Sequence, residues 1–410
     1  MITTACRICG NRELVPVLDL GEQALTGVFP TSRDQVVPAV PLELVVCSPA
    51  GCGLVQLRHT PDPELMYGDG YGYRSGIRPF MVNHLHSKVA AIRELVELGP
   101  KDLVVDIGSN DATLLRGYPE DGPRLVGIDP TGGKFLDRYP ENAELIVDYF
   151  SRETFENRFG TERAKVVTSI AMFYDLPDPL RFMRDVHDIL AEDGIWVMEQ
   201  SYMPSMLAAD AYDIVCHEHL EYYALRQIEW MAERVGLSVI RAELTDVYGG
   251  SLCVTLAKSP GRYPRDEAAL ARIRAAERDA GLDTTAPFEA FTRRVDRQRE
   301  ALLEFLARSR ESGRVTLGYG ASTKGNVILQ YCGLTERDLP CIGEVSPEKA
   351  GRFTPGTKIP IVSEEEAKQR KPDQLLVLPW IYRDGFIERE QRFLADGGKL
   401  VFPLPALSVV

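Results

Sequence analysis

Hydrophobic residues recur at helical spacing in one segment of the chain, and a long alternation of strands and helices follows it. The apolar residues of that first helix lie three or four positions apart, and Gly99-Pro100 predicts its end. They are Val82, Leu85, Val89, Ile92 and Val96. The short apolar runs that predict strands are Leu103–Ile107, Arg124–Asp129, Lys165–Ile170, Ile195–Glu199, Ser238–Ala242 and Leu252–Leu256. Their alternation with helices predicts a parallel sheet covered by helices on both faces.

The segments on either side of this alternation have different patterns. Residues 1–70 mix short apolar runs with Pro and Gly, which predicts strands and turns. A polar stretch from about 264 to 312, rich in Arg and Glu, predicts helices that link two domains. A second, smaller α/β unit then follows, with predicted strands at Arg314–Tyr319, Pro340–Glu344, Gln374–Leu378 and Lys399–Phe402. We therefore expect three domains, at 1–70, 71–258 and 259–410, the last of which includes the helical link.

Length and charge narrow the class of function. A chain of 410 residues fits two or three domains. The net charge of −13 disfavours a nucleic-acid partner, which calls for a basic surface, so a small-molecule substrate is the better interpretation. Met1–Cys6 has no basic region followed by an apolar one, and no apolar run reaches membrane-spanning length. These features predict a cytoplasmic protein without a membrane partner.

Four of the eight cysteines form two pairs near the N-terminus. Cys6 and Cys9 are separated by two residues, and Cys47 and Cys52 by four. Two turns that each offer two thiolates can close a tetrahedron around zinc and leave no open position for a substrate. The alternative is a set of unrelated buried thiols. We expect a structural zinc site that stabilises a segment too small to fold alone.

A strand, a turn and a helix beginning at Leu103 predict a cofactor site. Gly108 lets the backbone approach a ligand at the helix N-terminus. A dinucleotide-binding loop would also want glycine at positions 110 and 113, where Asn110 and Thr113 stand. Asn110 tolerates left-handed geometry, but the turn offers no Lys or Arg to a pyrophosphate. The alternatives are a nicotinamide site or a strand-turn-helix without any ligand.

The acidic residues near this turn suit S-adenosylmethionine better than a dinucleotide. Asp129, at the end of the next strand, can accept hydrogen bonds from two ribose hydroxyls. Asp106 would lie near the positively charged amino and sulfonium end of the cofactor, and Asp148 could contact the adenine. We expect S-adenosylmethionine as the cofactor.

Cys216-His-Glu-His-Leu-Glu-Tyr222 brings together groups that can transfer protons. His217 and His219 are two of only six histidines, and Glu218 lies between them. Imidazole exchanges protons near neutral pH, and a neighbouring carboxylate can orient it. The alternatives are a hydrogen-bonded core histidine and a His-x-His metal pair.

Together these segments resemble the nucleotide-sugar C-methyltransferases, which methylate a ring carbon of dTDP-linked keto-deoxysugars in antibiotic biosynthesis. The resemblance covers essentially the whole chain. It extends to Asp106-Ile-Gly-Ser-Asn-Asp111, His217-Glu-His219, Gly318–Asn326 and Gly351–Pro360. It implies an α/β fold with a small N-terminal zinc-binding domain, a central class I (Rossmann-like) methyltransferase domain and a C-terminal Rossmann-like domain. The zinc ligands would be Cys6, Cys9, Cys47 and Cys52.

The resemblance also implies roles for individual residues. His219 would remove a proton from the carbon beside a ring ketone, and Glu218 would orient or tune it. His217 and Tyr222 would donate hydrogen bonds to the enolate oxygen. The cofactor would contact Asp106, Gly108, Asn110, Asp111, Asp129, Asp148, Tyr71 and Ser75. The nucleotide-linked keto-sugar would contact Tyr73, Tyr248, Lys324 and Asn326, of which the last two lie on a loop suited to a diphosphate.

Three residues depart from the family pattern. Cys216 replaces a tyrosine that commonly precedes the His-Glu-His segment, Tyr248 replaces a histidine, and Ala112 replaces a glycine of the cofactor turn. The first two predict an altered acceptor pocket. Three other functions compete with C-methylation: O- or N-methylation of a related acceptor, an NAD-dependent sugar dehydrogenase or epimerase, and a zinc-ribbon binding module.

Overall fold

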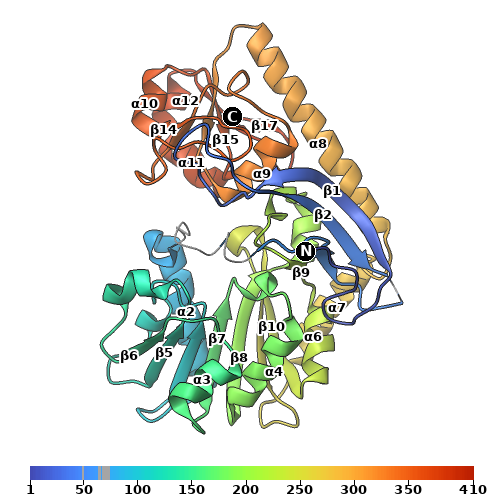
Figure 1. The fold of residues 1–410 in the computed structure, drawn as a ribbon, viewed down its shortest axis with the longest axis vertical. Coiled ribbons are helices and arrows are strands. Elements are labelled where there is room, and N and C mark those ends of the chain that lie inside the picture. The colour runs from blue at the N-terminus through green and yellow to red at the C-terminus, as the bar shows by residue number, and fades with distance from the viewer. Residues whose placement is uncertain (49, 63–65, 67–73) are drawn as a thin grey trace.

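The computed structural model describes residues 1–48, 50–62, 66 and 74–410, and these form three β-sheets with their covering helices (Figure 1). The central sheet lies in the lower part of the view and the C-terminal sheet in the upper part. The N-terminal strands β1 and β2 form a curved ribbon between them. The expected boundary at residue 70 lies outside the described residues. No helix in the described ranges is long and apolar enough to cross a membrane.

The central sheet has seven strands in the order β10-β11-β8-β7-β4-β5-β6. Its strands are β4 (Leu103–Ile107), β5 (Arg124–Ile128), β6 (Ala143–Ile146), β7 (Ala164–Ile170), β8 (Leu190–Ser201), β10 (Leu237–Thr245) and β11 (Ser251–Lys258). β4 to β8 are parallel, as expected. The expectation of a parallel sheet is wrong for the last two strands, because β10 and β11 form an antiparallel hairpin. Only residues 246–250 join them, too few for a crossover connection.

Helices cover both faces of this sheet, which confirms the expected layering. One face packs against Leu85, Val89 and Ile92 of α2. The other packs against Phe155 of α3 and Phe182 of α4. The helices of this unit are α2 (Pro79–Leu95), α3 (Arg152–Phe159), α4 (Pro179–Ile189), α5 (Met203–Ala208) and α6 (Leu225–Arg234). The parallel strands therefore end at one shared edge, where the loops of the candidate site begin.

The C-terminal unit is a second sheet in the order β14-β13-β12-β15-β16-β17. All of its pairings are parallel except that of the last strand. Its strands are β12 (Thr316–Tyr319), β13 (Ile342–Glu344), β14 (Ile361–Ser363), β15 (Gln374–Val377), β16 (Lys399–Phe402) and β17 (Ser408–Val409). Its helices are α9 (Thr323–Tyr331), α10 (Glu364–Gln369), α11 (Arg383–Arg389) and α12 (Gln391–Ala395). This arrangement is the expected Rossmann-like α/β unit.

Two helices fill the polar stretch between these units, as predicted. α7 (Glu267–Asp279) contacts α6 and β10, so it packs on the central unit. α8 (Ala286–Glu311) is the long helix at the right of Figure 1, and it contacts α5, β1 and β12. A single helix thus touches all three parts of the molecule.

The N-terminal sheet has the order β1-β2-β3-β9 and takes its last strand from the central unit. β1 (Leu14–Ala24), β2 (Ala39–Cys47) and β3 (Val55–Leu57) form an antiparallel meander. β9 (Glu221–Tyr222) pairs with β3. The His-Glu-His segment immediately precedes β9, so a strand of the zinc segment holds the end of that loop.

Candidate active site and zinc site

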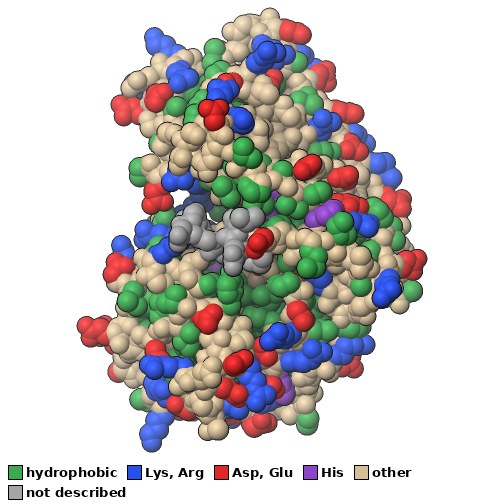
Figure 2. Space-filling view, viewed as in Figure 1, with side chains coloured by type: hydrophobic (Ala, Val, Ile, Leu, Met, Phe, Trp, Pro, Cys, Tyr) green, Lys and Arg blue, Asp and Glu red, His purple; other side chains and the backbone are tan. Residues whose placement is uncertain are grey.

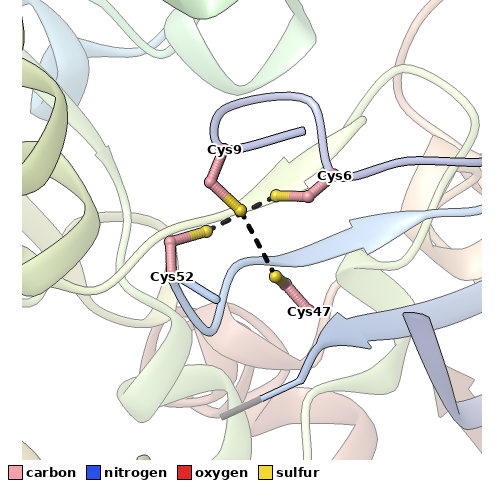
Figure 3. A group of neighbouring side chains, drawn as sticks. All are labelled: Cys6, Cys9, Cys47 and Cys52. Carbon is pink, nitrogen blue, oxygen red and sulfur yellow. Dashed lines mark hydrogen bonds between the residues drawn. The ribbon is translucent and has the colours of Figure 1, made fainter. Parts of the chain in front are cut away.

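The four cysteines converge on one point (Figure 3). Their sulfur atoms all lie within 4.8 Å of one another. The Sγ atoms of Cys6 and Cys52 are 3.4 Å apart, and those of Cys9 and Cys47 are 3.5 Å apart. A tetrahedral zinc ion with Zn–S bonds of about 2.3 Å separates its sulfurs by roughly 3.8 Å, so the four thiolates fit this metal. Among the described residues, no other group of three or more His, Cys, Asp and Glu side chains converges in this way.

The cofactor turn joins β4 to the next segment through left-handed residues. Gly108 has φ of 74°, Asn110 49° and Ala112 58°. Glycine adopts this conformation freely, whereas alanine pays roughly 1 kcal/mol for it. The left-handed φ at Ala112 explains why the family pattern has a glycine at this position. This chain keeps the turn although alanine stands there.

Asp129 is bound to this turn. Its Oδ2 accepts from the backbone N–H of Asn110 at 2.8 Å, and its Oδ1 accepts from the N–H of Thr131 at 2.6 Å. The hydroxyl of Thr131 also donates to Oδ1, at 2.7 Å. A carboxylate has about four acceptor positions, and these three bonds leave one for a ribose hydroxyl.

Other expected cofactor residues surround the same turn. Asn110 Oδ1 accepts from the N–H of Ser75 at 3.1 Å, and Asp111 Oδ2 accepts from that of Gly76 at 3.1 Å. The structure therefore brings Ser75 to the loop as expected. Asp148 is exposed beyond β6 and accepts only from its own neighbour Tyr149 in the bonds described. Tyr71 and Tyr73 lie outside the described residues.

Asp106 lies at the end of β4 and is buried. Burial raises its pKa to about 7, although the hydroxyl of Thr168 donates to it at 2.5 Å. A carboxyl group with a pKa near neutral pH can ionise when a cation approaches. The amino and sulfonium groups of S-adenosylmethionine would supply such a cation. The charges of this loop thus fit the cofactor predicted from the sequence.

His219 is held by a backbone carbonyl and an aromatic ring. Its Nδ1 donates to the carbonyl oxygen of Ile214 at 3.0 Å, and its ring packs on Tyr174 with centroids 4.2 Å apart. Because a carbonyl can only accept, Nδ1 must carry the proton, and Nε2 is then the acceptor nitrogen. Burial, helped by the positive charge of Lys324, lowers the pKa of His219 to about 3. The imidazole is therefore neutral at pH 7.

The Glu218 carboxylate contacts the N-terminal segment. It lies beside Gly27, where an added Cβ atom would come within 2.5 Å of Glu218 Oε1. Burial raises the pKa of Glu218, and hydrogen bonds from Cys216 and Thr26 oppose the shift. The partner of His219 is Ile214 and not Glu218, and no sequence pattern predicts it because the bonded group is a backbone carbonyl.

The remaining two members of the predicted catalytic cluster have different surroundings. Tyr222 donates to the carbonyl of Ile214 at 3.4 Å, so it shares an acceptor with His219. His217 donates from Nε2 to the carbonyl of Val40 on β2 at 3.0 Å. Burial lowers the pKa of His217 to about 4. The structure therefore places Tyr222 beside His219 and places His217 against the N-terminal sheet.

A pocket between the central and C-terminal units adjoins this loop. Lys324 of α9 and Tyr248 line it, with the ammonium 5.8 Å from the ring centre. Asp213 accepts from the indole N–H of Trp380 at 2.8 Å across the two units. Figure 2 shows a hollow between the upper and lower halves of the molecule with Lys and Arg at its edges. Asp213 and Trp380 were not predicted from the sequence.

Asn326 was predicted to contact a diphosphate together with Lys324. In the structure it is hydrogen-bonded to a backbone carbonyl. Its Nδ2 donates to the carbonyl of Thr26 at 2.8 Å, and its side chain is buried. One turn further along α9, Gln330 bonds both backbone groups of Ala24. In this structure Asn326 therefore joins α9 to the segment that packs on Glu218.

Asp175 is a further candidate residue that the sequence analysis did not select. It ends a short 3₁₀ helix, η4 (Phe173–Asp175), beyond the carboxyl end of β7. Its charge acts on Cys216 and Tyr222, whose pKa values are raised chiefly by burial. The signal for finding it was its place after a predicted parallel strand, at the same edge as Asp106 and Asp129.

The chain is similar in sequence to a known methyltransferase over almost its whole length. The chain is 31% identical to the C-methyltransferase NovU of Streptomyces niveus over 410 residues, which covers 99% of this chain and 96% of NovU. The chain belongs to the C-methyltransferase family. Domain families match in the same order: a zinc binding domain at 6–67, a methyltransferase domain at 81–242 and a C-methyltransferase C-terminal domain at 246–405. This C-methyltransferase thus uses S-adenosylmethionine, and its four-cysteine site binds zinc.

Solved structures match only part of the chain. The CcbJ methyltransferase from Streptomyces caelestis is 12% identical, covers 46% of this chain and 99% of its own, and has a TM-score of 0.35. A Burkholderia thailandensis 1,6-didemethyltoxoflavin-N1-methyltransferase is 12% identical, covers 43% of this chain and 77% of its own, and has a TM-score of 0.34. The TM-scores and sequence identities of these structures are too low to support the family assignment further.

The two buried histidines make the stability of this C-methyltransferase depend on pH. Their folded pKa values, about 4 for His217 and about 3 for His219, lie below the unfolded value of roughly 6.5. The unfolded chain therefore binds more protons on acidification. We expect the contribution of each histidine to the free energy of unfolding to be complete above pH 6.5. At pH 5 the free energy of unfolding should be lower by about 2 kcal/mol for each histidine.

Urea unfolding between pH 5 and 7.5 measures this effect. His217→Gln should flatten the pH dependence, whereas His187→Gln, at a half-exposed histidine bonded to Asp188, should not. If the free energy of unfolding changed equally with pH in the wild type and in His217→Gln, the expectation would be contradicted.

Proposed function

We propose that this C-methyltransferase methylates the carbon beside the ketone of a dTDP-linked 4-keto-deoxysugar, as a step in deoxysugar and antibiotic biosynthesis. The observation that carries the proposal is the hydrogen bond from His219 Nδ1 to Ile214, which leaves Nε2 as a base. Carbon becomes a nucleophile only after it loses a proton, and the ring ketone acidifies that proton. A cytoplasmic location, where thiols stay reduced and can bind zinc, is part of the same proposal.

In the proposed mechanism His219 Nε2 takes the proton from the acceptor carbon, and the electron pair of that C–H bond moves toward the ketone oxygen. The hydroxyl of Tyr222 would turn from the Ile214 carbonyl and donate a hydrogen bond to the resulting enolate. S-adenosylmethionine would supply the electrophilic methyl group to the enolate carbon, with S-adenosylhomocysteine as the leaving group. The His219 imidazolium would then return its proton to solvent. We assign His217 and Glu218 to holding this loop, because their side chains contact Val40 and the segment around Gly27.

The proposed diphosphate position is Lys324. Its ammonium lines the interdomain pocket, and a second cation, Lys349, donates to the carbonyl of Ala321 at the start of the same loop. The positive charge of Lys324 also lowers the pKa of His219. A diphosphate bound to Lys324 would offset that charge and raise the pKa of His219. The base would then gain strength only when the acceptor is bound.

A deuterium label on the acceptor carbon distinguishes the proposed C-methylation from O- or N-methylation. The substrate is a dTDP-4-keto-6-deoxysugar with deuterium on the carbon beside the ketone. C-methylation replaces the deuterium, so the methylated product must contain none. Retention of the label in the product would overturn the proposal in favour of an oxygen or nitrogen acceptor.

The control for this experiment is the same substrate incubated with S-adenosylhomocysteine in place of S-adenosylmethionine. Loss of deuterium without methylation would still identify a carbon base. The cofactor is checked separately by calorimetric titration with S-adenosylhomocysteine and with NAD. Binding of NAD alone would favour the dehydrogenase alternative.

A further inference from the structure

The zinc segment and the His219 loop are joined at β9. The N–H of Leu57 on β3 donates to the carbonyl of Leu220 at 2.9 Å, and the N–H of Leu220 donates to the carbonyl of Tyr174 at 2.8 Å. Tyr174 is the ring on which His219 packs. The residue next to the candidate base is therefore held from both sides, by the zinc segment and by the loop after β7.

Arg7 connects the first cysteine turn to this junction. It lies between Cys6 and Cys9, and its side chain is only 4% exposed. Its Nη1 donates to the carbonyl of Leu57 at 2.7 Å, and its Nε lies 3.4 Å from Oε1 of Glu221 on β9. The Glu221 side chain is completely buried, and Arg7 is its only ion-pair partner among the described residues.

The second cysteine turn is bonded to the other end of the same segment. The carbonyl of Cys52 accepts from Arg226 Nη2 at 3.2 Å and from Gln227 Nε2 at 3.0 Å. Both residues belong to the first turn of α6, which follows β9. The two cysteine turns thus contact β9 itself through one ion pair and the helix that follows it through two hydrogen bonds.

We propose that Arg7 and Glu221 are positioning residues through which the zinc-bound cysteine turns hold the 216–222 loop, and with it His219, in the geometry of a base. Zinc fixes the Cys6–Cys9 turn and therefore the guanidinium. Burial raises the pKa of the Glu221 carboxyl, and the positive charge of Arg7 opposes that shift. Without the guanidinium this completely buried carboxyl has no ion-pair partner among the described residues, and a buried polar group without a partner favours an open arrangement of its strand. The catalytic part of this inference depends on the proposed function, but the coupling between the zinc site and the loop does not.

Hydrogen–deuterium exchange of the full-length, zinc-loaded protein tests the coupling without any acceptor. In Arg7→Met we expect backbone amides in peptides covering 214–224 to exchange at least about tenfold faster. The substitution removes a buried contact and so lowers the free energy of local opening. Peptides covering β4 and β5 should be unchanged. Removal of zinc from the wild type by a chelator should accelerate the same 214–224 peptides.

A double variant separates the ion pair from general damage to the fold. Arg7→Met with Glu221→Leu removes both charges, and an apolar pair of similar size can replace a buried ion pair without loss. We expect it to restore slow exchange at 214–224 even if Arg7→Met alone is broadly destabilised. The matched control is Arg58→Gln, which removes the partly exposed Arg58–Glu43 pair from the same sheet. Exchange as fast in the double variant as in Arg7→Met would overturn the proposal, and so would wild-type exchange in Arg7→Met.

Kinetics then link the coupling to the reaction. We expect Arg7→Met to lower kcat by about tenfold or more and to leave the Kd for S-adenosylhomocysteine unchanged, since the cofactor turn lies elsewhere. Arg7→Lys should recover part of kcat. An exchange result as expected, together with unchanged kcat, would confirm the coupling and contradict the role of His219.

Discussion

Replacement of His219 by glutamine is expected to lower kcat of methyl transfer by about 10³-fold, within the range that a positioned general base contributes. Glutamine keeps a hydrogen-bonding group near Ile214 but has no nitrogen that can take a proton at neutral pH. The cofactor turn at Asp106 is a separate part of the site, so we expect the Kd for S-adenosylhomocysteine to change by less than about twofold.

The measurement is single-turnover methylation of the dTDP-linked keto-sugar, with calorimetric titration of the same preparation by S-adenosylhomocysteine. Loss of deuterium from the labelled acceptor should stop in His219→Gln, because the C–H bond is no longer broken. His187→Gln, at a half-exposed histidine, is the control and should retain wild-type kcat. A His219→Gln enzyme that still exchanged the acceptor hydrogen would show that another group is the base.

The sequence predicted the strands that are buried on both faces. β4 and β5 are mostly apolar, β7 has an apolar pair at its centre, and most residues of the three strands are buried. β6 escaped prediction because all four of its residues are only partly buried and it lies at the sheet edge. β14 and β17 are three and two residues long, too short to give a period. β9 is equally short, and only its pairing with β3 defines it.

Residue chemistry was predictable where spacing alone determines the geometry. Two cysteine pairs on turns predict a tetrahedral site, and the structure brings the four sulfurs together. The surroundings of the His-Glu-His segment depend instead on contacts distant in sequence. Val40, which bonds His217, is 177 positions away, and Thr26, which bonds Asn326, is 300 away. A local pattern carries no information about such partners, and it says nothing of a backbone carbonyl such as that of Ile214.

The zinc site should have the largest effect on stability. We expect Cys47→Ser to lose zinc and to lower the free energy of unfolding of the N-terminal sheet by about 5 kcal/mol or more, because zinc bound by thiolates contributes about 10 kcal/mol or more to small zinc domains. Cys47 ends β2 and is buried, so no neighbouring side chain in the described sheet can replace the lost thiolate.

Zinc content and thermal unfolding of the purified variant measure this loss, and Cys341→Ser is the matched control. Cys341 is also a buried thiol, but it lies in the C-terminal unit and outside the zinc cluster. A decrease no larger than that of Cys341→Ser, or full retention of zinc, would contradict a structural role for the metal. Because β9 pairs with β3 of the zinc segment, the same variant should lose methyl transfer even at temperatures where the central sheet remains folded. The stability of the small domain and the position of the candidate base then depend on the same four thiolates.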